Sequence, residues 1–116
     1  MTISEAAFHD IVRVWLTDCV GAGNLTHEPT LRTGREPDFL AEGPLATWAV
    51  EVENDADSLT DGFGQARLYA KHATEYVPLL VLPPVEASSR RELALLRDDV
   101  RIVELDPGTG DVLSGP

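Results

Sequence analysis

Apolar residues recur at intervals of three and four over the first twenty positions, which predicts an amphipathic helix of about four to five turns. Thr2 and Glu5 form a capping-box pattern at its start, in which each side chain satisfies a free backbone N–H group. The glycine-rich residues 21–24 predict its end. The apolar face of this helix comprises Phe8, Ile11, Val12, Trp15, Leu16, Cys19 and Val20.

Short stretches of alternating apolar and polar residues follow the helix and are separated by turn residues. They predict strands at residues 25–32, 38–42 and 47–53, with a hairpin turn at residues 33–36 between the first two strands. Because side chains alternate between the two faces of a strand, Glu51 and Glu53 of the third strand project to the same side of the sheet. The rise along a strand separates them by about 6–7 Å.

The rest of the chain alternates between helical and extended patterns. Residues 59–76 have a helical pattern, and the continuous apolar run at residues 76–82 is typical of an interior strand covered on both faces. A short helix at residues 88–97 and a strand at residues 100–105 follow, before a tail that we expect to fray. The order helix, three strands, helix, strand, helix, strand predicts a three-layer α/β domain with a mixed central sheet.

Length and composition restrict the class of protein. A chain of 116 residues predicts a single domain spanning residues 1–116, and 43% hydrophobic residues are typical of a globular protein. No apolar run approaches the roughly 18–20 residues that cross a bilayer, and the N-terminus lacks a signal-peptide pattern. We therefore predict a cytoplasmic protein without a membrane partner. The single Cys19 fits this location, and we expect it to be a buried thiol.

The formal net charge of −11 is unusual, and eight of the nine basic residues are arginine. This composition favours a halophilic source with a high-salt cytoplasm, although a GC-rich genome would explain the missing lysines equally well. A negative surface opposes loose binding to nucleic acid, because that affinity depends largely on neutralising phosphates. A protein of this charge that acts on nucleic acid needs divalent ions at its site to supply positive charge.

Three carboxylates, those of Asp38, Glu51 and Glu53, fall on adjacent predicted strands. Hard divalent ions such as Mg²⁺ bind through one or two carboxylates together with water and substrate phosphate. Two glutamates on one sheet face repel each other unless both face water or a cation lies between them. The alternative is an ordinary solvent-facing side of a strand in a protein with twenty acidic residues.

The helical pattern at residues 59–76 places Gln65 and Tyr69 on one face, one turn apart. Gly62 and Gly64 lower helix propensity and predict a close backbone approach at the start of this helix. The alternative for Gln65 is the exposed edge of the helix, and for Tyr69 an ordinary aromatic residue of the core.

Together these elements resemble the PD-(D/E)XK nuclease superfamily. Pro37-Asp38 matches the first element, Glu51-Val52-Glu53 matches (D/E)-x-K with its lysine replaced, and Gln65-x-x-x-Tyr69 is similar to the RecB-like and Cas4-like branch. Small Holliday-junction-resolvase-like nucleases are a related match. The resemblance covers roughly residues 2–82 and implies a restriction-endonuclease-like core.

The resemblance also implies roles for individual residues. Asp38 and Glu51 would be ligands of Mg²⁺ or Mn²⁺, and Glu5 could add the acidic ligand that some members place on the first helix. Gln65 would orient a backbone phosphate or the metal-bound water, and Tyr69 would position the substrate.

Glu53 is the departure from the superfamily pattern, because it occupies the position of the lysine. Some members carry glutamate there, and others move the lysine to the neighbouring helix. Lys71 is the only lysine of the chain, and about 100° per residue places it about 240° around the helix from Gln65. Arg67 lies about 200° away. Lys71 and Arg67 are therefore weak candidates for substrate positioning, and Glu53 as an acidic substitute is the preferred interpretation.

Two further groups of residues contain side chains of the types that bind zinc or a DNA backbone. His9 and His27 have no metal-ligand spacing with each other or with Cys19, so a zinc site is not expected. We interpret an arginine-rich region mainly as a solvated helix face, with contact to a DNA backbone as the alternative. It comprises Arg90, Arg91, Arg97 and Arg101.

The leading hypothesis is a small Mg²⁺-dependent deoxyribonuclease that acts on DNA ends, junctions or branched intermediates. A domain of this size has no room for a separate sequence-reading domain, so we expect a homodimer or a partner protein. The second hypothesis is a nuclease-fold protein without catalysis that serves as a binding or regulatory module. The third is an unrelated acidic α/β protein with a structural role.

Overall fold

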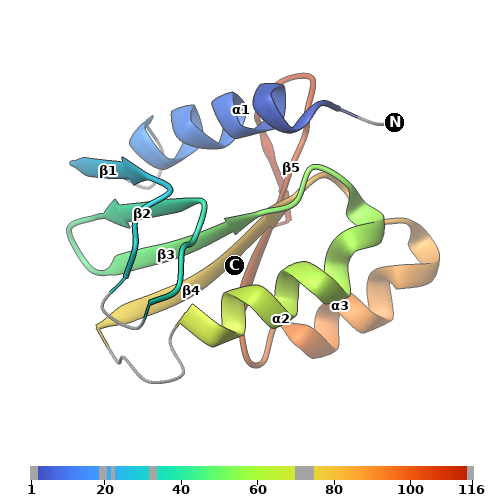
Figure 1. Ribbon diagram of the computed structural model, residues 1–116. Helices are drawn as coiled ribbons and strands as arrows, with labels where there is room; N and C mark the ends of the chain where they lie inside the picture. Colours follow the sequence, from blue (N-terminus) through green and yellow to red (C-terminus); the bar gives the residue numbers. More distant parts are fainter. Residues whose placement is uncertain (1–2, 19–20, 22, 32–33, 70–74, 115–116) are drawn as a thin grey trace.

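The computed structural model describes residues 3–18, 21, 23–31, 34–69 and 75–114 of the chain (Figure 1). These residues form three α-helices, two short 3₁₀ helices and six strands. The helices are α1 (Glu5–Asp18), η1 (Ala56–Ser58), α2 (Leu59–Tyr69), η2 (Ala87–Ser89) and α3 (Arg90–Leu96). The strands are β1 (Asn24–His27), β2 (Phe39–Glu42), β3 (Thr47–Val52), β4 (Tyr76–Leu82), β5 (Arg101–Leu105) and β6 (Val112–Ser114).

All six strands belong to one mixed sheet whose spatial order, β1-β2-β3-β4-β5-β6, is the order of the chain. The first three strands form an antiparallel meander. β3, β4 and β5 are parallel, and α2 and α3 provide the two crossover connections between them. β6 returns antiparallel to β5 and closes the sheet at that edge. The predicted mixed α/β architecture is therefore confirmed.

The helices cover both faces of the sheet (Figure 1). α1 packs its apolar stripe onto one face, where Phe8, Val12 and Leu16 meet β-strand residues in a single buried cluster. α2 and α3 cover the other face, where Leu59 and Leu93 join a second cluster. Burying each such side chain contributes about 1.5–3 kcal/mol, so both clusters fix the helices on the sheet.

β4 has the predicted bounds, Tyr76–Leu82, and lies in the interior of the sheet. Leu79 and Val81 belong to the cluster under α1, whereas Leu80 and Leu82 belong to the cluster under α2 and α3. A strand covered on both faces needs apolar residues at every position, which explains the uninterrupted run in the sequence.

The first helix begins later than the capping-box pattern predicted. α1 starts at Glu5, and the Ser4 hydroxyl oxygen accepts a hydrogen bond from the Ala7 N–H group at 3.2 Å. Ser4 is therefore the N-cap, and Glu5 occupies the first helical position. Thr2 and Cys19 lie outside the described residues. Among the described residues, no helix combines the length and apolar character needed to cross a membrane.

Two strands differ from their predicted extents. The first strand ends at His27 because Glu28 has a left-handed backbone, with φ of 52°, and Pro29 has no N–H group for a ladder. The tail beyond residue 105 was expected to fray, but residues 112–114 form β6. Gly110, at φ of 77°, permits the turn that brings β6 back beside β5.

Candidate functional site

Asp38 is held at the start of β2 by hydrogen bonds of both its backbone and its side chain. Its N–H group donates to the Val50 carbonyl at 2.9 Å, and its own carbonyl accepts from the Glu28 N–H group at 2.8 Å. The Val52 N–H group donates to Asp38 Oδ2 at 2.7 Å. The antiparallel pairing of β2 and β3 therefore places the Asp38 carboxylate at the end of β3, as the sequence predicted for two adjacent strands.

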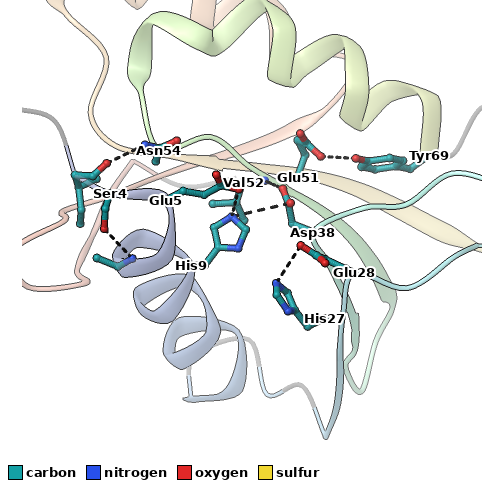
Figure 2. A network of polar contacts seen from close by, with 12 residues as sticks. Ser4, Glu5, His9, His27, Glu28, Asp38, Glu51, Val52, Asn54 and Tyr69 are labelled. Atoms are coloured by element: carbon teal, nitrogen blue, oxygen red, sulfur yellow. Dashed lines mark hydrogen bonds and ion pairs between the residues drawn. The ribbon is translucent and has the colours of Figure 1, made fainter.

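Glu51 and Glu53, at the same end of β3, both contact α2. The Tyr69 hydroxyl donates a hydrogen bond to Glu51 Oε1, and Figure 2 shows the Glu51 carboxyl turned toward this tyrosine. A Cβ atom built on Gly62 would lie 2.6 Å from Glu53 Cγ, so only glycine leaves room for this glutamate. The predicted close approach is confirmed at Gly62. No atom of the described ranges lies within 4 Å of such an atom at Gly64, so the prediction is wrong there.

α1 supplies a histidine that the sequence analysis did not connect with the acids. His9 Nε2 lies 3.8 Å from Glu5 Oε1 and 4.0 Å from Asp38 Oδ1 (Figure 2). The His9 side chain is buried, and its Nε2 atom has no hydrogen-bond partner among the residues that the structure describes. Two features of the sequence point to this residue. It lies one helical turn from Glu5, and it occupies a buried position between Phe8 and Val12.

A surface cavity of about 440 Å³ adjoins His9 between α1 and the end of β1. His27 forms part of its wall, and the His27 and His9 rings both contact Phe39, with centroid distances of 5.0 and 5.6 Å. The strained backbone of Glu28 borders the same cavity. Backbone strain of this kind is common beside functional residues, and here it lies next to Asp38.

The carboxylates perturb one another electrostatically. Burial, together with the nearby charges of Asp38 and Glu53, raises the pKa of Glu51 to about 8, against a lowering by the Tyr69 hydrogen bond. Burial also raises the pKa of Asp38, although the Val52 N–H group and His9 oppose this shift. The pKa of Glu53 is raised by burial and by Asp38. Carboxyl groups in this state gain stability from a bound proton or from a cation.

The residues predicted on α2 divide into two groups. Tyr69 and Gly62 face the glutamates, whereas Gln65 and Arg67 have exposed side chains. Gln65 and Arg67 line a groove of about 790 Å³ along α2. The structure thus places Gln65 on the exposed edge of the helix, and no hydrogen bond joins it to the acids within the described part of the chain. Lys71 lies outside the described residues.

The donor groups of the site do not converge in a ready-made metal centre. Within the described ranges, no three side chains of His, Cys, Asp or Glu are arranged to hold an ion. Glu5, His9 and Asp38 face one another on the α1 side, while Glu51 and Glu53 are held on the α2 side. The unpartnered Nε2 atom of His9 and the mutually repelling carboxylates are nevertheless donors that suit a divalent cation.

Three of the four arginines in the arginine-rich region have structural partners, although Arg90, Arg91 and Arg101 are also exposed, as their interpretation as a solvated face predicted. Arg90 Nη1 donates to Glu104 Oε1 at 2.5 Å, and Glu104 is fully buried. Arg97 Nη2 donates to the Ser114 hydroxyl at 2.6 Å, and the Arg101 guanidinium lies 5.5 Å from the centroid of the Trp48 ring. These arginines therefore fix α3, β5 and β6, which leaves them less available for a DNA backbone.

Comparisons with protein-family models, with curated proteins and with solved structures found no significant match. The central features of the site are the acids where the start of β2 lies beside the end of β3, the buried histidine of α1 and the contacts with α2.

Proposed function

We propose that this protein is a Mg²⁺- or Mn²⁺-dependent nuclease with a restriction-endonuclease-like fold. The observation that carries the proposal is the position of Asp38 between His9 of α1 and the acidic end of β3. The order of elements supports it, because the α1-β1-β2-β3-α2-β4 part of the chain follows the core that the PD-(D/E)XK resemblance implies. Asp38, Glu51 and Glu53 occupy the motif positions within that core.

In this proposal Asp38 and Glu51 hold the ion, with His9 or Glu5 as a further ligand from α1. The bound ion would neutralise charge on the scissile phosphate and lower the pKa of a water molecule. Tyr69 bonds Oε1 of Glu51 and so orients this carboxylate, whose second oxygen would face the ion.

Glu53 would take the proton from the attacking water. Burial and neighbouring acids raise its pKa, which brings this carboxylate nearer to the range that suits a general base at neutral pH. Gly62 holds it in place, because any larger residue would collide with its side chain. Glu53 thus replaces the positive charge of a lysine with a proton acceptor.

The proposed substrate is DNA, in the form of ends, junctions or branched intermediates. With a net charge of −11, the chain needs divalent ions to approach a polyanion, and a homodimer or a partner protein would supply further contact surface.

The test combines metal binding with cleavage. The wild-type chain is titrated with Mn²⁺ and Mg²⁺ by calorimetry, and cleavage of plasmid, linear and junction DNA is followed at several salt concentrations. Asp38→Asn should abolish both cleavage and metal binding, whereas Asp57→Asn, at an exposed acid of η1, should change neither. Equal cleavage by wild type and Asp38→Asn would reject the proposal.

A second candidate is a nuclease-fold protein without catalysis that serves in binding or regulation. The observation in its favour is the surroundings of Glu53, since the charged neighbours that raise its pKa are the acids Asp38, Asp61 and Glu5. A lysine at this position would add positive charge to such a site. This function predicts no cleavage by wild type under any metal or salt condition, and Glu53→Lys provides the matched variant that could restore it.

A further inference from the structure

A groove of about 480 Å³ separates α1 from the loop that joins β5 to β6. Figure 1 shows this loop lying beside α1. Ile11, Val14 and Trp15 contribute apolar surface from the helix, and residues 108–111 form the opposite wall. Val14 is 59% exposed, so a large apolar side chain faces solvent here.

The loop wall of the groove is held in one conformation by its own hydrogen bonds. The Gly110 N–H group donates to the Asp106 carbonyl at 2.7 Å, and the Asp106 N–H group donates to the Asp111 carbonyl at 2.8 Å. The Asp111 N–H group donates to the Thr109 hydroxyl oxygen at 3.2 Å. A wall that is already ordered loses little conformational entropy when a ligand binds.

Acidic side chains surround the apolar surface of the groove. Asp10 and Asp18 lie one turn on either side of Val14 along α1, and Asp111 lies on the loop. All three are exposed, and Asp10 Oδ1 also contacts Arg13 Nη1 at 3.4 Å. The groove therefore presents an apolar centre with a carboxylate at each end.

The spacing of these groups defines the ligand that would match them. Asp10 and Asp18 are eight residues apart, which corresponds to about 12 Å along a helix. In an extended segment, side chains i, i+2 and i+4 share one face, and the outer two are about 13 Å apart. We propose that the groove binds an extended segment of a partner protein with an apolar residue flanked two positions away on each side by lysine or arginine.

The partner is a different protein rather than a second copy of this chain. The sequence contains one run with basic residues four apart around an apolar or aromatic one, from Arg67 to Lys71. Its central residue, Tyr69, is buried in α2 and bonded to Glu51, so this run cannot enter the groove of another molecule. Asp10 borders both this groove and the cavity beside His9, but the proposal does not depend on catalysis.

The test compares two capped peptides of identical composition and charge, Lys-Thr-Leu-Thr-Lys and Lys-Lys-Leu-Thr-Thr. Titration into ¹⁵N-labelled full chain is followed by NMR amide shifts. The first peptide should shift the amides of residues 108–111 and bind about fivefold more tightly than the second, since each well-placed ion pair contributes up to about 1 kcal/mol. Equal affinity of the two peptides, or no binding at millimolar concentration, would overturn the proposal.

Two variants separate groove binding from general attraction to an acidic protein. Asp18→Asn should weaken binding of the first peptide about two- to fivefold, whereas the same change at Asp57, an exposed acid outside the groove, should leave it unchanged. Val14→Ser should weaken it without altering its dependence on salt. If Asp57→Asn and Asp18→Asn had the same effect, the peptide would be binding to overall charge, and the proposal would be wrong.

Discussion

Two regions of this molecule hold partly or fully buried acids in opposite electrostatic environments: Glu104 in β5, and Glu51 with its acidic neighbours at the end of β3. Glu104 is fully buried in β5, yet it accepts hydrogen bonds from Arg90, from the Ser114 hydroxyl and from the Val85 N–H group. Burial alone would raise its pKa, but these partners lower the pKa below its ordinary value.

Glu51 lies at the other extreme. Its hydrogen-bond donor in the described part of the chain is the neutral hydroxyl of Tyr69. Burial, together with the charges of Asp38 and Glu53, raises the pKa of Glu51 to about 8. A carboxylate supplied with donors stabilises the fold, whereas one surrounded by other carboxylates is stable only with a proton or a cation. The comparison separates a structural acid from an acid that is available for binding.

The largest effect is expected from breaking the Glu104 network. Glu104→Ala would leave the Arg90 charge and the Val85 N–H group without their partner and would detach Ser114 of β6. We expect a loss of about 3–5 kcal/mol in the free energy of unfolding, measured by urea denaturation. Glu86→Gln, at an exposed acid near η2, is the control and should change it by less than about 0.5 kcal/mol. Similar stability of the two variants would show that the network contributes little.

The next effect is stabilisation by metal. If Asp38 and Glu51 hold a divalent ion, Mn²⁺ at 100 times its dissociation constant should raise the free energy of unfolding by about 2.7 kcal/mol. Glu51→Gln should remove this gain in the free energy of unfolding. Glu104 should not contribute to it, because the oxygens of Glu104 already accept hydrogen bonds from protein groups. Thermal denaturation with and without Mn²⁺ measures the difference. An equal gain in Glu51→Gln would place the ion elsewhere.

Gly62 and Gly64 provide a matched pair on α2. Gly62→Ala would force its new methyl group against Glu53 and Leu80, and overpacking of this kind costs about 1–3 kcal/mol. Gly64→Ala meets open space, so the higher helix propensity of alanine should stabilise the chain by up to about 1 kcal/mol. Urea denaturation of both variants should therefore give shifts of opposite sign, and shifts of the same sign would contradict the packing of Glu53 on Gly62.

The two acids should also give opposite pH dependence. Glu51 has a pKa of about 8 in the folded chain against an ordinary value of 4.5, so the folded state binds more protons between these values. Its contribution to stability is complete at low pH and is lost as pH rises toward 8. Glu104, with its lowered pKa, contributes stability that is lost as pH falls below about 4.5. Urea denaturation at a series of pH values measures both effects. Glu51→Gln should reduce the loss of unfolding free energy between pH 4.5 and about 8. Glu104→Gln should reduce the loss below about pH 4.5.

The sequence was sufficient for those parts of the site that depend on local periodicity. Alternation along β3 placed Glu51 and Glu53 on one face, and both side chains contact α2. The apolar run of β4 revealed a strand covered on both faces. These features follow from the regular geometry of one strand or one helix, so a single segment contains the necessary information.

The remaining features depend on contacts between distant segments. His9 reaches Asp38 only because α1 crosses the sheet at that point, so its spacing from Glu5 and its buried position could mark it as unusual but could not identify Asp38 as its neighbour. Glu104 acquires its partners from α3 and β6, and the pairing of β6 itself depends on the turn at Gly110. Gln65 shows the reverse case, because a motif position alone did not determine which way the side chain faces.

The smallest predicted effect concerns Glu28, whose carboxylate adds to the negative charge around Asp38 and whose backbone has φ of 52°. Glycine adopts this conformation without strain, so Glu28→Gly should leave stability unchanged or raise it by about 1 kcal/mol. Pro29→Ala, at the next residue, should not have this effect, because it leaves the left-handed Glu28 in place. The same glycine variant removes one of the charges that raise the pKa of Asp38, so that pKa should fall, which NMR titration of the carboxyl carbon can measure. A lower pKa of Asp38 together with unchanged metal affinity would mean that Glu28 adds to the repulsion within the acidic group without contributing a ligand.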